Sequence, residues 1–318
     1  MFGERECMYI MEREPDEYVP ICILDHQVGD CFLAALIAYF NYLYGIGYEL
    51  MQFSWYFVFE KESLFQEIKL INFDEVSSYV ANRFGIGLFF LNNFLNMNIE
   101  KLVQNELKQG RAVGVTVDYN RCGWTRGIGT KDYIYHFILL IGYSNEYYWC
   151  VDNVATSVQM IKKKLVEETA KEMLLFVSIG GFNPIYDYRN SFLTKDYWEK
   201  RKRMIYDIIE MKKHLHDNLI ENELYFIVSK LRLIANNYND FGFFLKEIAD
   251  VNECEKCVAN LEKSFKMLSF ACLKLVGRKK SKIDKMIDEY IEAIIKNEME
   301  LRTCLKGYNK NNEFNVEI

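Results

Sequence analysis

The pattern of hydrophobic and polar positions divides the chain near residue 190. Residues 1–190 contain most of the glycines and several short runs of alternating β-branched residues, which are typical of strands. Residues 191–318 contain no proline, and their apolar residues recur with the i, i+3, i+4 spacing of amphipathic helices. The sequence therefore predicts an α+β domain over residues 1–190, in which a helix packs on an antiparallel sheet, followed by an all-helical domain over residues 191–318.

The order of elements in the α+β domain can be predicted from local signals. An apolar helix over residues 31–44 is expected to begin after the N-cap Asp30 and to end at Gly45. A second helix, over residues 99–109, is expected to end at Gly110. A strand, a polar loop, a strand, a tight turn and a return strand should follow, over residues 112–119, 120–132, 133–142, 144–146 and 147–152.

Composition and charge narrow the class of protein. Half of the 318 residues are hydrophobic, which predicts packed domains rather than disorder. The net charge of −6 argues against a nucleic-acid binder. The first 20 residues lack the apolar region of a signal peptide, and the longest apolar run, residues 32–40, is too short to cross a bilayer. We therefore expect a cytoplasmic protein without a membrane partner.

The nine cysteines are scattered along the chain, and in the cytoplasm they are expected to be reduced thiols. Only Cys254 and Cys257 form a C-x-x-C pair. No second pair and no nearby histidine accompanies them in the sequence, which favours two small apolar residues on a helix over a metal site. The sequence predicts no metal and no cofactor.

Three residues form a candidate site for nucleophilic catalysis. Cys31 is the first residue of the predicted helix, where free backbone N–H groups and the helix dipole favour a thiolate. His136 lies in the predicted strand 133–142, and Asp152 ends the return strand. If the turn centres on Ser144, positions 136 and 152 face each other, and Asp152 could orient the imidazole toward Cys31.

Each of these residues also has an ordinary structural interpretation. Cys31 could be a small buried apolar residue, and His136 a hydrogen-bonded core residue. A register slip of one residue would place Asn153 opposite His136 in place of Asp152. His26 precedes Cys31 closely and could compete as the base. The order of the elements favours the catalytic interpretation, because few folds share it.

The first 190 residues resemble domains of the butirosin biosynthesis protein H type, in the wider group similar to the double-glycine-leader (C39) peptidases. A helical region typically follows this domain in the family. The matching segments are DCFLAAL at 30–36, LKQGRAV at 107–113, VDY at 117–119, HFILLIGY at 136–143 and CVDN at 150–153.

The resemblance implies a papain-like cysteine protease fold and an acyltransferase activity, as in the amide-forming enzymes of closthioamide-type polythioamide assembly. In such enzymes the cysteine attacks a carrier-protein thioester, and an amine then takes the acyl group. On the matching positions, Cys31 would be the nucleophile, His136 the base and then the acid, and Asp152 the orienting residue. The implied partners are an acyl or peptidyl carrier protein, whose phosphopantetheine thioester is the donor, and a small amine. The alternative is a cysteine peptidase or amidase with the same residues and water as acceptor.

Two positions depart from the peptidase pattern. Peptidases of the C39 type carry an oxyanion-binding glutamine six residues before the cysteine and tend to have glycine directly after it. Here these positions are Asp25 and Phe32. The candidate oxyanion donors are therefore the Cys31 backbone N–H, with Gln27 or His26 as side-chain help.

Other segments are candidates for substrate binding. The predicted loop 120–132 carries three cationic side chains and a tryptophan: Arg121, Arg126, Lys131 and Trp124. Their charge suits a phosphopantetheine phosphate or an acidic carrier protein, and a connector held by tryptophan packing is the alternative. The aromatic run 53–59 is expected to pack under the helix 31–44 or to line an acyl pocket. The helical domain could be a lid, a carrier dock or the interface of a homodimer.

Overall fold

The computed structural model of the chain describes six segments: residues 15–59, 68–92, 97–124, 134–216, 221–275 and 280–311. The chain forms two compact units. The first comprises residues 1–47 and 80–183, and the second comprises residues 48–79 and 184–318. The mixture of helices with an antiparallel sheet confirms the predicted α+β class.

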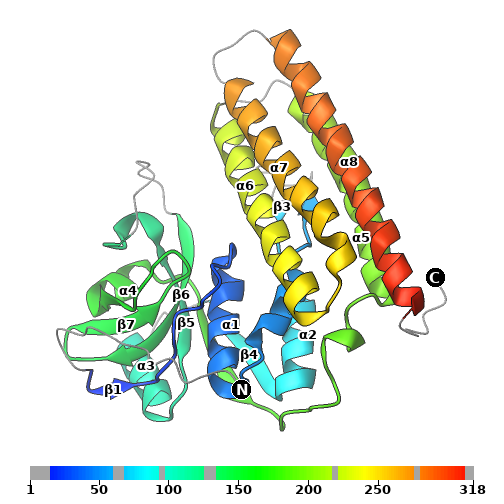
Figure 1. Cartoon of the computed structure of the whole chain (residues 1–318). Helices are drawn as coiled ribbons and strands as arrows, with labels where there is room; N and C mark the ends of the chain where they lie inside the picture. The colour runs from blue at the N-terminus through cyan, green and yellow to red at the C-terminus, as the bar shows by residue number, and fades with distance from the viewer. Residues whose placement is uncertain are drawn as a thin grey trace. The chain divides into compact units, whose positions relative to one another are not determined.

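An antiparallel sheet is the centre of the first unit (Figure 1). Its strands are β1 Glu17–Tyr18, β4 Ile86–Leu91, β5 Val113–Asp118, β6 Tyr135–Tyr143, β7 Tyr147–Val151, β8 Gln159–Lys162 and β9 Met173–Ser178. The order across the sheet is β4-β9-β5-β6-β7-β8, and β1 pairs with one end of β6. Strands β5, β6 and β7 confirm the three strands that the sequence predicts between residues 112 and 152.

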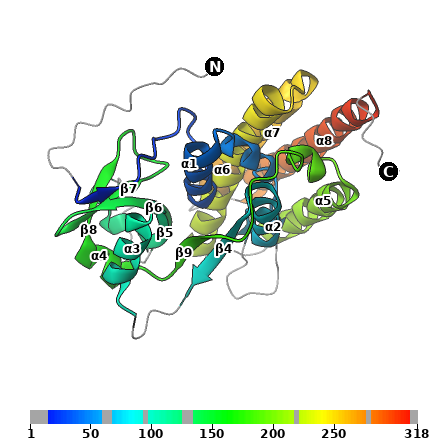
Figure 2. The same ribbon diagram turned by 90° about the horizontal axis from the view of Figure 1, so that it is seen from below.

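Helices cover both faces of this sheet. Figure 2 shows α1 (Cys31–Tyr44) on one side of β5 and β6, and α3 (Ile99–Lys108) and α4 (Lys163–Thr169) on the other. All residues of β6 from 136 to 143 are accordingly buried. The bounds of α1 match the prediction, because Asp30 caps its first turn and Gly45 ends it in the left-handed region at φ 73°.

The pairing of β6 with β7 differs from the predicted register. Leu139 lies opposite Val151, and an irregularity between Leu140 and Gly142 shifts the rest of the pairing. Continuing that register places position 152 beside 138 rather than directly opposite His136. The expectation that positions 136 and 152 face each other is therefore wrong by two residues.

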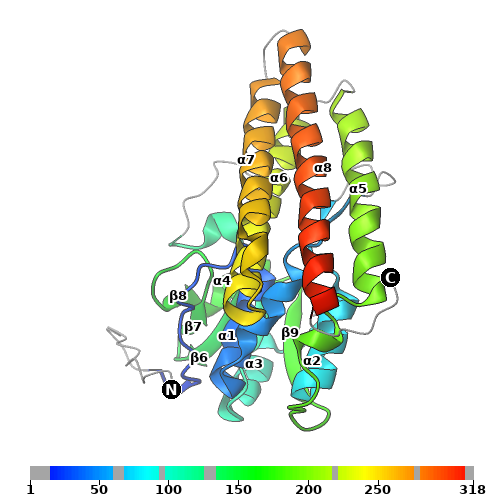
Figure 3. The same ribbon diagram turned by 45° about the vertical axis from the view of Figure 1, so that its right-hand side comes forward.

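The second unit contains four long helices and several short elements. The long helices run side by side in Figure 3 and are α5 Lys195–His216, α6 Glu221–Phe243, α7 Glu255–Leu275 and α8 Lys280–Asn311. Helix α2, Phe73–Phe84, is divided between the units: its residues up to Tyr79 belong to the second unit, and those from Val80 belong to the first. The remaining elements are the paired strands β2 Val58–Phe59 and β3 Ile68–Lys69, the 3-10 helices η1 Gly47–Phe53, η2 Tyr119–Arg121, η3 Tyr188–Asn190 and η5 Asn252–Cys254, and the π-helical turn η4 Phe244–Ile248.

The assignment of residues 48–79 differs from the predicted domain division, which placed them in the domain of residues 1–190. They group with the second unit, which resumes at residue 184 rather than 191 and includes a two-stranded sheet, so it is not all-helical. The aromatic run 53–59 belongs here: Trp55 contacts the ring of Tyr197, and Phe57 contacts that of Phe265. These ring partners lie in the second unit, and the packing of the run under the helix 31–44 stays a prediction.

A buried ion pair joins α5 to α8. Arg201 and Glu298 are both fully buried, and the guanidinium donates two hydrogen bonds to the carboxylate at 2.6 and 2.8 Å. Tyr238 of α6 donates to the same carboxylate at 3.1 Å. The Arg201 guanidinium also donates to the Tyr197 hydroxyl at 2.6 Å and lies 4.8 Å from the ring centroid of Trp55. These contacts fix the rotation of α5, α6 and α8 about their axes.

The cysteines follow the expectation of free thiols with one exception. Cys22 is disulfide-bonded, which the expectation of nine reduced thiols did not foresee. The other described cysteines are free, including Cys254 and Cys257. The Cys257 sulfur lies 4.0 Å from that of Cys304, across α7 and α8. Among the described residues, no helix has both the length and the apolarity needed to cross a membrane.

Candidate active site

The thiol of Cys31 lies at the N-terminus of α1. The Asp30 carboxylate accepts from the Leu33 N–H at 2.9 Å, and the Asp30 carbonyl accepts from the Ala34 N–H at 2.9 Å. This cap makes Cys31 the first helical residue, where the helix dipole favours negative charge. The Phe137 N–H of β6 donates to the Cys31 sulfur at 3.4 Å, which adds a second stabilising group for a thiolate.

His136 lies beside this sulfur and is held by Asp152. The Nε2–H of His136 donates to the Asp152 Oδ1 at 2.9 Å, so its Nδ1 is left for the Cys31 side. The same Oδ1 accepts from the Val154 N–H at 3.1 Å, in the turn that follows β7. Position 152 lies diagonal to His136 across the pair β6–β7, and this separation is short enough for the two side chains to meet.

The electrostatics of this pair favour a protonated imidazole. Burial by itself lowers the pKa of His136, but hydrogen bonds and charges from Asp152 and Cys31 outweigh it and raise the pKa to about 10. Burial opposes the charge of Asp152 in the same way, and the hydrogen bonds of His136, Trp124 and Val154 outweigh it, so the pKa of Asp152 is lowered. Below pH 10 the site therefore holds an imidazolium next to a carboxylate.

Trp124 completes the hydrogen bonding of Asp152. Its indole N–H donates to the Asp152 Oδ2 at 2.6 Å. Asp118 holds the start of the loop that carries Trp124, because its Oδ1 accepts from the N–H groups of Asn120 at 3.1 Å and Ile134 at 3.2 Å. The sequence places Trp124 among the substrate-binding candidates, whereas its observed contact is with the orienting carboxylate.

Asn153 does not contact His136, which was its alternative role, but the segment before Cys31. Its Nδ2 donates to the carbonyls of Val28 at 3.0 Å and Gly29 at 3.4 Å. It therefore ties the segment that precedes Cys31 to the end of β7, and Asp152 is the residue that contacts His136. The choice between Asp152 and Asn153, open in the sequence, is decided by these hydrogen bonds.

The remaining predicted residues are not brought to the sulfur by any described contact. Arg121 is ion-paired with Glu168 of α4 at 2.7 Å, and both side chains are exposed. Gln27 is exposed. Arg126 and Lys131 lie outside the described residues. The roles of these residues in substrate or oxyanion binding stay predictions.

Three contacts around the site were not found from the sequence motifs. The Phe137 N–H reaches Cys31 across 106 positions of sequence. The Phe137 ring needs the glycine at position 114, because a Cβ there would lie 2.4 Å from the ring Cζ. The Tyr119 ring meets His136 edge-on with 5.0 Å between centroids. Only the glycine within a β-branched strand gave a sequence signal of a close approach.

The other free thiols of the first unit are poor nucleophiles. Cys122 and Cys150 are buried, whereas Cys31 is half-buried. Burial raises the pKa of the Cys122 thiol to about 12 and that of Cys150 well above its ordinary value. No group of three or more metal-binding side chains gathers among the residues that the structure describes. The chemistry available at this site is nucleophilic attack by one sulfur, with one imidazole to carry a proton.

The substitution Trp124→Phe tests the hydrogen bond to Asp152. It keeps an aromatic ring but removes a donor to a buried charge, so we expect the rate of reaction of Cys31 with an acyl thioester to fall about tenfold. Single-turnover kinetics would measure this rate. Trp198→Phe is the matched control, since that buried indole nitrogen has no hydrogen-bond partner within the described part of the chain. Equal rates for Trp124→Phe and wild type would contradict a role in positioning Asp152.

The raised pKa of His136 predicts a titration that depends on Asp152. We expect the His136 ring resonance in NMR spectra, identified by its loss in His136→Gln, to titrate near pH 10. Asp152→Asn should lower that pKa by about 1–3 pH units, because the opposite charge is lost. Since the folded-state pKa lies above the unfolded value, the interaction stabilises the fold fully below pH ~6.5 and is lost as the pH rises through 10. A titration unchanged by Asp152→Asn would show that the carboxylate does not hold the imidazolium.

No protein-family model matches the chain. A search of curated proteins finds no match either.

Proposed function

We propose that the first unit is a cysteine-dependent acyltransferase that forms an amide bond, with Cys31, His136 and Asp152 as its catalytic triad. The observation that carries the proposal is the continuous chain from the Cys31 sulfur through His136 to the Asp152 carboxylate. A cysteine at a helix N-terminus, facing a histidine and an acid on antiparallel strands, is also what the predicted papain-like fold requires. The resemblance of residues 1–190 to amide-forming enzymes supports the same conclusion.

In the first half-reaction an acyl thioester loads Cys31. The Nδ1 of the protonated His136 already carries the proton that the Cys31 thiol has given up, and the sulfur attacks the thioester carbonyl carbon. The Cys31 backbone N–H, at the positive end of α1, is the candidate donor to the oxyanion. When the tetrahedral intermediate collapses, the carbon–sulfur bond to the donor breaks, and the departing thiolate takes the proton from His136. An acyl group joined to the Cys31 sulfur remains.

In the second half-reaction an amine removes the acyl group. Its nitrogen attacks the acyl carbon while His136 takes the proton that the amine loses. The bond to the Cys31 sulfur then breaks, which releases the amide and returns the thiolate beside a protonated His136. The Asp152 carboxylate keeps Nε2 protonated through both steps, so Nδ1 is always the atom that exchanges the proton.

The nature of the donor and of the acceptor follows from the family resemblance. It implies an acyl or peptidyl carrier protein, charged with a phosphopantetheine thioester, and a small amine in the cytoplasm. The site requires only that the donor has a good leaving group and that the acceptor competes with water. A peptidase or amidase would use the same first half-reaction, and the two differ in the group that discharges the acyl-enzyme.

The test is the discharge of the acyl-enzyme. The full chain is incubated with a panel of acyl thioesters of pantetheine, and its intact mass is followed with and without added amines. We expect an adduct of one acyl group that amines convert to amide products faster than water hydrolyses it. Discharge at the same rate with and without every amine would contradict the transferase and favour the hydrolase.

A further inference from the structure

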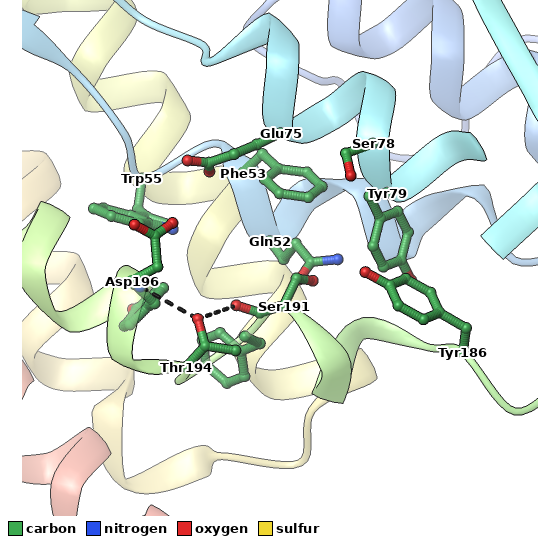
Figure 4. A pocket seen from close by; sticks show the side chains of 12 residues that line it. Gln52, Phe53, Trp55, Glu75, Ser78, Tyr79, Tyr186, Ser191, Thr194 and Asp196 are labelled. Carbon is green, nitrogen blue, oxygen red and sulfur yellow. Dashed lines mark hydrogen bonds between the residues drawn. The ribbon is translucent and has the colours of Figure 1, made fainter. Parts of the chain in front are cut away.

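A cavity of about 200 Å³ lies within the second unit, lined by residues of the segment 52–79 and of the segment 186–197 (Figure 4). Its aromatic lining includes the buried rings of Phe53, Tyr79 and Phe192. An apolar cavity of roughly 150 Å³ is enough to hold benzene, whereas sites for drug-sized ligands span roughly 300–1,000 Å³. The space therefore suits a single ring with a short chain.

Gln52 presents an unused donor to this cavity. Its side chain is 2% exposed, and its Oε1 accepts from the Ser191 hydroxyl at 2.6 Å. Its Nε2 is buried and has no hydrogen-bond partner among the described residues. Figure 4 shows this nitrogen directed away from Ser191, toward the side of Tyr79 and Tyr186. Buried amide donors in native proteins are normally paired, so this one points to a ligand that brings an acceptor.

The cavity also carries a net negative charge. Glu75 and Asp196 line it, and Lys200 of α5 is ion-paired with both carboxylates. Two acids and one lysine leave one negative charge at the lining. In the view of Figure 4, the two acids lie with Trp55 on one side of Gln52, opposite Tyr79 and Tyr186. A cation is attracted both by the carboxylates and by the faces of aromatic rings.

We propose that this cavity binds a small organic amine with an aromatic ring and an oxygen acceptor. The ammonium group lies at Glu75 and Asp196, the ring lies among the aromatic side chains, and the oxygen accepts a hydrogen bond from the Gln52 Nε2. The net negative charge that remains beside Lys200 disfavours an anion of the same size. This site is formed entirely by the second unit and does not depend on the chemistry of Cys31.

Tyramine is the first probe, because it combines an ammonium group, one ring and a hydroxyl. Isothermal titration calorimetry on the full chain would compare it with phenethylamine, which lacks the hydroxyl, and with 4-hydroxyphenylacetate, which replaces the ammonium by a carboxylate. We expect tyramine to bind about 3- to 10-fold more tightly than phenethylamine, from the one neutral hydrogen bond. No binding of 4-hydroxyphenylacetate is expected. Absence of tyramine binding at millimolar concentration, or equal binding of the carboxylate, would overturn the proposal.

Variants of the chain test whether tyramine binds in this cavity. Gln52→Leu should weaken tyramine binding to the level of phenethylamine and leave phenethylamine unchanged. Asp196→Asn, at an exposed side chain, should weaken the binding of both amines, and less so at high salt. Glu199→Gln removes an exposed carboxylate from the same helix outside the cavity and should change nothing. Unchanged tyramine affinity in both Gln52→Leu and Asp196→Asn would overturn the assignment.

Cys31→Ala separates this site from the proposed active site. Tyramine affinity should be the same in Cys31→Ala and wild type, whether or not wild type forms an acyl-enzyme. Loss of tyramine binding in Cys31→Ala would mean that the amine is held at the first unit, and the proposal for the cavity would be wrong. Failure of acylation with tyramine binding intact would instead contradict only the proposed acyltransferase.

Discussion

Replacement of Cys31 by alanine is expected to abolish acyl-enzyme formation, with a loss of at least about 10³-fold in the rate of reaction with acyl thioesters. The reason is that, among the cysteines that the structure describes, only Cys31 combines partial exposure, the N-terminus of α1 and hydrogen bonds with His136 and the Phe137 N–H. The buried thiols of Cys122 and Cys150 cannot replace it, because burial raises their pKa values. Intact mass after incubation with the thioester panel measures the effect.

Cys304→Ala is the matched control for that experiment. Cys304 is also a free, half-buried cysteine, but it lies in α8, where its neighbour is Cys257 and not a histidine. Its replacement should leave acylation at the wild-type rate. Equal labelling of Cys31→Ala and wild type would remove Cys31 from the mechanism and, with it, the proposed function.

Replacement of Glu298 by alanine is expected to lower the free energy of unfolding by about 3–5 kcal/mol. The change leaves the Arg201 guanidinium fully buried without its carboxylate, and it also removes the acceptor of the Tyr238 hydroxyl. A buried, uncompensated charge costs far more than the interaction that a surface pair loses. Urea unfolding followed by circular dichroism at the helical band would measure the loss.

Two comparisons make the Glu298 result specific. Asp288→Ala breaks a partly exposed pair with Lys212, 3.0 Å apart, and should cost only about 0–1 kcal/mol. The double variant Arg201→Met/Glu298→Leu should recover most of the stability, since apolar residues of similar volume often replace a buried pair without loss. If Glu298→Ala unfolds at the wild-type urea concentration, the buried pair does not hold α5 and α8 together.

Much of the first unit could be predicted because its signals are local. Asp30 and Gly45 mark the two ends of α1 through caps that involve only neighbouring residues. The strands β5, β6 and β7 follow from β-branched and aromatic runs that a polar loop and a tight turn separate. The path of residues 48–79 into the second unit could not be predicted, because it depends on ring contacts with residues far along the chain, such as Phe57 with Phe265.

The same distinction applies to the polar groups. In the sequence, Arg201 is one position of a helical repeat and has no visible partner. Its partner Glu298 is 97 positions away. Gln52 belongs to no motif. Its significance comes from the cavity around it and from its amide nitrogen, for which the described segments offer no hydrogen-bond partner. Periodicity reports which face of an element is apolar, but it does not report which buried polar residues meet on neighbouring elements.

For the candidate site, the sequence by itself determined the residue types and their elements: a cysteine at a helix start, a histidine in a strand, and an acid at the end of the return strand. Only the tertiary structure decided that Asp152 rather than Asn153 meets His136, that Trp124 and the Phe137 N–H join the site, and that Arg121 pairs with Glu168. The physical reason is that caps and alternation act between near neighbours. The partners of a buried side chain depend on strand register, and one irregularity between Leu140 and Gly142 shifts that register in a way that no local signal announces.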